Sequence, residues 1–201
     1  MKNILYFIFL LTSITFSQTK EINITMEEIL INSDIQELLD FENINYLKIR
    51  FSGDKLIGKK YELTVKEIWK GKVKSESEIL NSETFPFEDW RKINDTILEI
   101  SVISKLSKKK NLKMVFKTPR VKITKNFKAT NSNDYHFTDL IDSNYEKVSV
   151  GNKFYLLSNA LMYEYKGTLR SFVGGINNGD VLKWGEKYGI KHYLIFEMKF
   201  E

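Results

Sequence analysis

Hydrophobic and polar residues alternate with a period of two along most of this 201-residue chain. Between positions 46 and 51, Leu47, Ile49 and Phe51 alternate with Lys48 and Arg50, which predicts a strand with one buried and one solvated face. Comparable alternation recurs in several later segments, at 61–65, 96–104, 112–117, 121–127 and 192–200. The segment 153–165 is the most apolar run and the best candidate for a central strand. Such segments joined by short turns predict antiparallel sheets arranged as a sandwich or a partly open barrel.

Helical patterns are confined to short stretches. Thr25 with Glu28, and Ser33 with Gln36, have the spacing of a capping box, which predicts two short N-terminal helices. The second helix has an apolar stripe that we expect to dock on a sheet, formed by Ile35, Leu38 and Leu39. The predicted fold class is therefore mainly β (α+β), with these two helices and one or two further short helices packed on the sheet.

The segment YELTVKEIWKGK at 61–72 looks at first like a motif. Its alternation changes phase at Glu67 and Ile68, which predicts a bulge or the end of a strand. We interpret Lys70 and Gly71 as part of the following turn, and we expect Trp69 to cover the end of the sheet.

A strand that ends in aromatic-Lys-Gly, as at 65–71, resembles the equivalent strand of netrin-like OB-fold domains, including relatives of metalloproteinase inhibitors. The resemblance covers about a dozen residues. It implies a barrel rather than a sandwich, and no functional residue is carried over from it. Those domains typically contain cysteines, whereas this chain has none.

The N-terminus has the pattern of a secretory signal peptide at 1–17, with Lys2 before the apolar run Ile4–Leu11. We expect residues 18–201 to form one β-rich domain, exported to the bacterial periplasm or the medium. The absence of cysteine excludes disulfides, thiolate metal sites and a thiol nucleophile. It also favours a bacterial protein over a disulfide-rich eukaryotic one.

The net charge is +5, but the lysines look scattered, and the only tight run is at 108–110. A solvated hairpin tip explains this run better than a phosphate clamp. The sequence therefore predicts no nucleic-acid partner and no membrane span.

The two histidines are the natural candidates for acid–base chemistry. Asp134, His136 and Asp139 could form a metal or acid–base site if a helix begins near Tyr135. The better-supported interpretation makes Asp134 the N-cap of an amphipathic helix. His192 opens the last strand, where we expect it to be half-exposed.

No other sequence motif indicates catalysis. The chain lacks a nucleophile elbow, a phosphate-binding glycine loop, a dinucleotide fingerprint, a His-Glu-x-x-His zinc motif and a calcium loop. No cofactor or metal is therefore expected.

Two aromatic segments are candidate binding surfaces. In the loop at 171–189, Trp184 and Tyr188 lie near amide side chains suited to sugar or peptide recognition, those of Asn177 and Asn178. The favoured alternative is a short helix, begun by Asp180, whose buried stripe is Val181, Trp184 and Tyr188. The segment at 85–90 contributes a possible partner surface or a lid over the sheet, formed by Phe85, Phe87 and Trp90.

Three hypotheses follow for function. The first is an exported domain that binds a protein, peptide or glycan of the cell envelope without catalysis. The second is a periplasmic hydrolase or metal-dependent enzyme built on Asp134, His136 and Asp139. The third is a structural accessory of an envelope complex.

Overall fold

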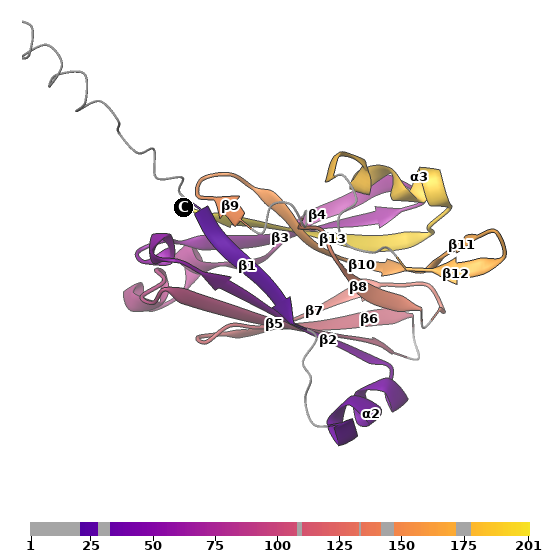
Figure 1. The fold of residues 1–201 in the computed structure, drawn as a ribbon, viewed down its shortest axis with the longest axis horizontal. Helices are drawn as coiled ribbons and strands as arrows, with labels where there is room; N and C mark the ends of the chain where they lie inside the picture. The colour runs from indigo at the N-terminus through magenta and orange to yellow at the C-terminus, as the bar shows by residue number, and fades with distance from the viewer. Residues whose placement is uncertain (1–20, 28–32, 108–109, 133, 142–146, 172–177) are drawn as a thin grey trace, which may run out of the picture.

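The computed structural model describes six ranges of the chain, 21–27, 33–107, 110–132, 134–141, 147–171 and 178–201 (Figure 1). The described residues are mainly in antiparallel strands, and the fold includes a sheet curled into half a barrel. The predicted fold class is confirmed at this level. Among the described residues, no helix is long and apolar enough to span a bilayer.

The larger sheet has six strands in the order β7-β6-β5-β2-β1-β9. Its three consecutive strands β5, β6 and β7 are joined as a meander, whereas β1 pairs with β2 on one side and with β9 on the other. The bounds are β1 Glu21–Glu27, β2 Ile44–Ser52, β5 Ile97–Ser107, β6 Asn111–Lys117, β7 Lys122–Lys128 and β9 Lys147–Ser149.

The second sheet has five strands in the order β4-β3-β13-β10-β8. Its central strand is the C-terminal β13, which pairs with β3 over nine residues. The bounds are β3 Tyr61–Trp69, β4 Lys72–Asn81, β8 Tyr135–Asp139, β10 Phe154–Leu161 and β13 His192–Phe200. A separate hairpin joins β11 Tyr163–Tyr165 to β12 Thr168–Arg170, and it projects from the end of the molecule in Figure 1.

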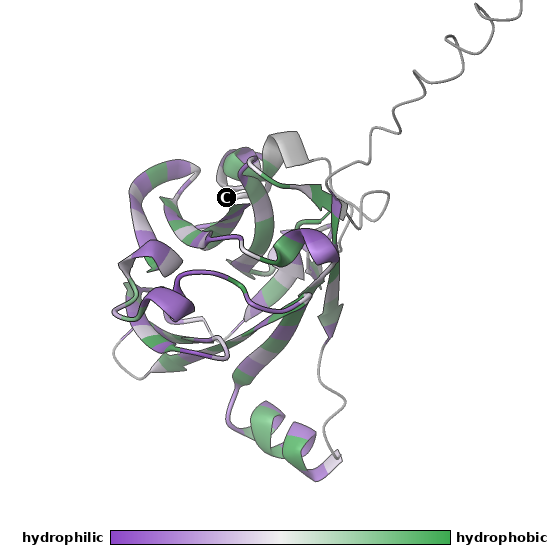
Figure 2. Cartoon of the chain, turned by 90° about the vertical axis from the view of Figure 1, so that its left-hand side faces the viewer, coloured by the Kyte–Doolittle hydropathy of each residue, from purple (hydrophilic) through white to green (hydrophobic). Residues whose placement is uncertain are grey.

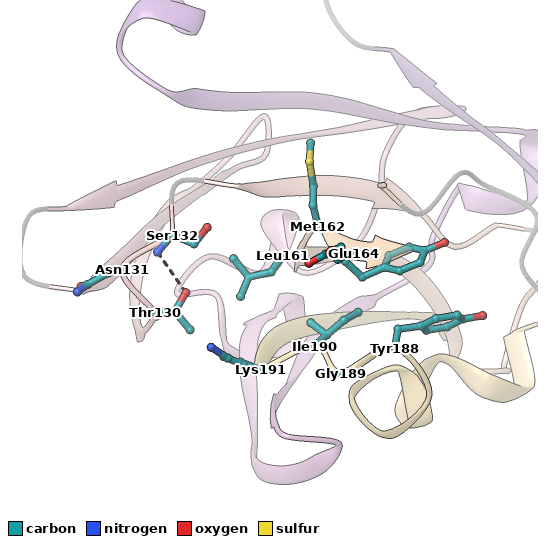
Figure 3. A pocket seen from close by; sticks show the side chains of 11 residues that line it. Thr130, Asn131, Ser132, Leu161, Met162, Glu164, Tyr188, Gly189, Ile190 and Lys191 are labelled. Carbon is teal, nitrogen blue, oxygen red and sulfur yellow. Dashed lines mark hydrogen bonds between the residues drawn. The ribbon is translucent and has the colours of Figure 1, made fainter. Parts of the chain in front are cut away.

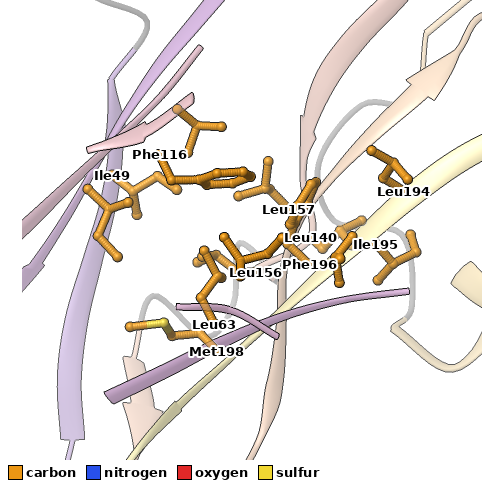
Figure 4. Packing of buried hydrophobic residues seen from close by; sticks show 14 of the residues in the cluster. Ile49, Leu63, Phe116, Leu140, Leu156, Leu157, Leu194, Ile195, Phe196 and Met198 are labelled. Atoms are coloured by element: carbon orange, nitrogen blue, oxygen red, sulfur yellow. The ribbon is translucent and has the colours of Figure 1, made fainter. Parts of the chain in front are cut away.

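The core lies between the two sheets. Ring centroids of Phe51 and Phe200 are 5.1 Å apart, and those of Phe116 and Phe196 are 5.5 Å apart, so aromatic side chains from both sheets meet there. Figure 4 shows Phe116 pointing toward the side chains of the facing sheet. The period-two alternation predicted these inward residues, including the three of β2, all of which are buried.

Helical elements are short and lie outside the sheets. Two α-helices occur in the described part of the chain, α2 Ser33–Phe41 and α3 Trp184–Tyr188. The short 3₁₀ turns are η1 Asp54–Leu56, η2 Ser82–Thr84, η3 Glu88–Trp90 and η4 Asn178–Lys183. Tyr193 fixes η4 and α3 to the outer face of β13, because its hydroxyl donates to the Leu182 carbonyl at 2.8 Å and accepts from the Gly185 amide at 3.3 Å. The prediction of a short helix packed on the sheet is confirmed.

The predicted turn at the end of the 61–72 segment is confirmed. β3 ends at Trp69 and β4 begins at Lys72, and the two residues between them, Lys70 and Gly71, have φ angles of 50° and 76°. Positive φ at both central residues is the requirement of a type I′ hairpin turn. The pairing register shifts between Glu67 and Ile68, at the predicted bulge.

The predicted helix cap at Thr25 is wrong, and Glu28, the other residue of that capping box, lies outside the described residues. Thr25 lies in strand β1, where it pairs with Arg50, because pairing with β2 satisfies backbone groups that a helix cap would otherwise serve. The second helix forms as α2, yet it has no buried residue. Leu38 is 59% exposed and Phe41 80% exposed, so the expected docking of this helix on a sheet is also wrong. Figure 2 shows α2 standing away from the body of the fold.

Because α2 buries no apolar side chain, it should contribute little to stability. We expect Leu38→Gln to change the free energy of unfolding by no more than about 0.5 kcal/mol. Leu47→Ala in β2, where the leucine is 6% exposed, should cost about 2–5 kcal/mol. Urea denaturation of both variants checks this difference, and a large loss in Leu38→Gln would mean that α2 packs on the fold.

Candidate functional site

The 171–189 segment divides into buried and surface residues. Trp184 is completely buried with Val181, as the helix interpretation predicts, so its indole is not available to a ligand. Tyr188 is half-buried at the end of α3. Asn177 lies outside the described residues, and for Asn178, which begins η4, only the backbone is described.

The 85–90 segment is also divided. Phe85 is buried, and its ring meets that of Tyr61 edge-on with centroids 6.2 Å apart. Phe87 is 58% exposed and packs edge-on against the half-buried Trp90 at 4.7 Å. Phe85 is therefore a core residue, and only the Phe87–Trp90 pair remains as a surface.

Residues 135–139 form strand β8, so the predicted helix beginning near Tyr135 is wrong. The pairing of β8 with β10 explains the change, because it fills the edge of the sheet beside a strand whose last six residues are buried. His136 and Asp139 are three residues apart in a strand and so point to opposite faces. Burial lowers the pKa of His136 and raises that of Asp139. Within the described ranges, no three His, Cys, Asp or Glu side chains are grouped as metal ligands.

His192 is completely buried, which corrects the expectation that it is half-exposed. Antiparallel pairing places His192, the first residue of β13, opposite Trp69, the last residue of β3 before the Lys70–Gly71 turn. The Tyr135 hydroxyl lies 2.6 Å from His192 Nδ1 and accepts a hydrogen bond from the Thr130 amide at 3.2 Å. With the hydroxyl donating to Nδ1, the imidazole carries its proton on Nε2.

Glu67, in strand β3, also contacts Trp69 and His192. Its Oε1 accepts a hydrogen bond from Trp69 Nε1 at 2.6 Å and lies 3.6 Å from His192 Nε2. The rings of Trp69 and His192 are in contact, with centroids 4.3 Å apart. We call the set Glu67, Trp69, Thr130, Tyr135 and His192 the His192 network.

Burial lowers the pKa of His192 to about 4, although the Glu67 carboxylate opposes the shift. Burial also raises the pKa of Tyr135. Both side chains are therefore neutral near pH 7, and the Tyr135–His192 hydrogen bond joins β8 to β13 across the interior.

A pocket of about 470 Å³ opens beside the network (Figure 3). Three segments line it: 130–132 after β7, 161–164 across the start of β11, and 188–191 between α3 and β13. Thr130 belongs both to the pocket wall and to the His192 network. The Thr130–Tyr135 and Tyr135–His192 hydrogen bonds thus connect one wall of the pocket to the end of the sheet.

The pocket combines aromatic faces with varied polar groups. The rings of Tyr163 and Tyr188 meet at a tilt of 42° with centroids 4.8 Å apart. Glu164, Lys191 and Ser132 also line the pocket. Such a site can hold a small molecule that has both an apolar face and several hydroxyl groups.

Comparisons with protein-family models, with curated proteins and with solved structures gave no match for this chain. The function must therefore be inferred from its own residues.

Tyr188 is the one pocket residue that the sequence pattern indicated as a candidate; the other lining residues were not predicted. Trp69 and His192 are 123 positions apart, and only the β3–β13 register brings them together. The aromatic residue before the turn and the histidine at the start of the last strand were visible signals. Their pairing could not be read without knowing which strands are neighbours.

Proposed function

We propose that the protein is an exported binding domain and that the pocket beside the His192 network holds a neutral sugar residue. The observation that carries this proposal is the Tyr163–Tyr188 ring pair in a pocket of about 470 Å³ that also contains carboxylate, ammonium and hydroxyl groups. Export is proposed from the signal-peptide pattern at 1–17.

The chemistry of a sugar matches this lining. One face of a pyranose ring presents C–H groups, which pack against an aromatic face, while its hydroxyl groups both donate and accept hydrogen bonds. Glu164 accepts hydrogen bonds and Lys191 donates them. The Ser132 hydroxyl donates its proton to Asp134 and accepts from the Asp134 amide, so it can offer a ligand only its remaining lone pair. Leu161 and Ile190 supply buried apolar surface at the base of the pocket.

Rigidity of the wall supports binding. Ordering a loop upon binding costs free energy, so a wall that is already fixed favours affinity. Here the Thr130 amide is held by Tyr135, and the Ser132 amide donates to the Thr130 hydroxyl at 3.4 Å. The 130–132 segment therefore enters binding already constrained by hydrogen bonds.

The hydrolase alternative has no specific observation in its favour, because His136 and Asp139 point to opposite faces of β8. The structural-accessory alternative would leave the pocket without a role. The glycan-binding proposal accounts for the pocket and keeps the predicted contribution of Tyr188.

We expect Tyr188→Ala to weaken sugar binding at least tenfold, because it removes one of the two aromatic faces. Saturation-transfer NMR with glucose, galactose, mannose and N-acetylglucosamine, each tested separately, measures this. Lys191→Ala should weaken the same interaction without disturbing α3, and its thermal melt should match the wild type. Tyr155→Ala, which alters a half-buried tyrosine on the outer face of β10, serves as the matched control and should bind normally.

Absence of saturation transfer from all four sugars at millimolar concentration would refute the proposal. Equal transfer in the wild type and in both pocket variants would refute it as well. Saturation transfer from a panel of tripeptides, with none from the sugars, would favour peptide recognition instead.

A further inference from the structure

Lysines occupy the outer face of the six-stranded sheet on β5, β6 and β7. Lys113 and Lys117 alternate with the buried Leu112, Met114 and Phe116 of β6, so they point away from the core. The strand register extends this surface to both neighbouring strands. It places Lys105 directly opposite Lys113 and Lys117 directly opposite Lys122. We call these four lysines the basic face.

The charge of this region differs sharply from that of the remaining chain. Residues 100–133 contain nine lysines and one arginine but no aspartate or glutamate. The segment contributes +10 to a total of +5, so the remainder carries a net charge of −5. The lysines are therefore unevenly distributed: nine of the 27 fall within residues 100–133, and six of these nine lie in β5, β6 and β7.

The basic face has little internal compensation. Lys105 pairs with Glu42, which follows α2. Lys113, Lys117 and Lys122 form no ion pair within the described residues. Like charges directly opposite one another on neighbouring strands destabilise a sheet. The fold thus maintains one uncompensated cross-strand pair, Lys117–Lys122, and a second pair, Lys105–Lys113, in which Glu42 offsets the charge of Lys105.

Protection of a sheet edge explains only part of this pattern. Lysines on an edge strand prevent pairing with other chains, and β7 is the edge of its sheet. β6 and β5 are interior strands with both neighbours present, so Lys113, Lys117 and Lys105 have no edge to protect. A bound anion would remove the repulsion at both cross-strand pairs.

We propose that the basic face binds an anionic polysaccharide through its carboxylate or sulfate groups. Lys113 and Lys117 are four residues apart on one strand, which separates the two cross-strand lysine pairs by about 13 Å. Two clusters of positive charge at this separation fit an extended polymer that carries repeated negative charges. A single small anion could occupy only one cluster.

The residue types favour a polysaccharide over other polyanions. Single-stranded nucleic acid is usually held by aromatic side chains on which bases stack, whereas Ile103, Val115 and Thr124 lie between the two lysine pairs. Arginine, which binds phosphate bidentately, is absent from the basic face. A membrane surface would be met by exposed large apolar residues, and this face presents none.

The test is binding of the intact protein to alginate and to heparin, measured by calorimetry across a range of salt concentrations. We expect affinity to fall as salt rises, and we expect the double variant Lys113→Gln/Lys117→Gln to lose at least tenfold in affinity with a shallower salt dependence. Lys72→Gln/Lys74→Gln on β4 removes the same charge from exposed positions of the other sheet and should retain nearly full affinity. Neutral dextran should not bind this face.

An equal loss of affinity in both double variants would mean that net charge alone attracts the polymer, and this result would overturn the proposal. Tighter binding to duplex DNA, or to vesicles of phosphatidylglycerol, would overturn it in favour of those partners. Lys117→Gln should raise the melting temperature, because it relieves repulsion with Lys122; a fall would show that the lysine is retained for stability. Neutral sugars report on the pocket and charged polymers on this face, so either proposal can fail without the other.

Discussion

Replacing Gly185 with alanine is expected to lower the free energy of unfolding by about 3 kcal/mol, through overpacking against backbone atoms. A Cβ at this position would lie 2.1 Å from the Gly71 amide nitrogen and 2.5 Å from its Cα. Those atoms belong to the Lys70–Gly71 turn, which pairing of β3 with β4 holds in place. Relief of this steric overlap therefore requires α3 to move away from the turn.

The sign of this effect is the opposite of what helix propensity predicts. Gly185 lies within α3 and has no positive φ, so alanine alone would favour the helix by about 1 kcal/mol. Displacement of α3 would also expose Trp184 and shift Tyr188 at the pocket. We therefore expect weakened sugar binding together with the loss of stability.

Chemical denaturation of Gly185→Ala measures the effect, with Lys183→Ala as the control at an exposed position just before α3. The control should remain within about 0.5 kcal/mol of the wild type. A Gly185→Ala variant as stable as the wild type would contradict the close approach of the helix to the turn.

The second large effect is a dependence of stability on the protonation of His192. The pKa of this group is about 4 in the folded protein and about 6.5 in an unfolded chain. Between these values the unfolded state binds more protons, so stability is fully present above pH 6.5 and is lost as the pH falls toward 4. The loss attributable to this residue should be roughly 3 kcal/mol.

His192→Gln should flatten the dependence of the free energy of unfolding on pH between 6.5 and 4. The comparison with wild type separates the His192 contribution from that of other groups with shifted pKa values, since burial lowers the pKa of His136 and raises that of Asp139. His136→Gln is the matched control and should leave the His192 contribution in place. NMR titration of the His192 ring should show a neutral imidazole at pH 5.5; a protonated ring at that pH would contradict the prediction.

Local patterns in the sequence predicted the sheets well because strand alternation is a local property. Leu47, Ile49 and Phe51 are buried as their spacing requires, and the turn at Lys70–Gly71 contains a glycine, which adopts positive φ without a steric penalty. The phase change at Glu67 and Ile68 likewise marks a real shift of register.

The structural predictions failed where contacts between segments distant in the sequence determine the structure. Residues 135–139 have a spacing that suits a helix, but pairing with β10 makes them a strand. Docking of α2 was expected from its apolar stripe, although nothing in that stripe identifies a surface to receive it. The His192 network and the basic face both depend on cross-strand register, which the sequence alone does not reveal.

The central claim is that the pocket beside the His192 network binds a neutral sugar. Backbone-amide NMR spectra, recorded during titration with each of the four sugars, test it most directly. We predict that at least one sugar shifts the signals of residues 130–132, 161–164 and 188–191, with β6 and β7 unchanged. Shifts confined to another surface, or none at millimolar sugar, would contradict the claim.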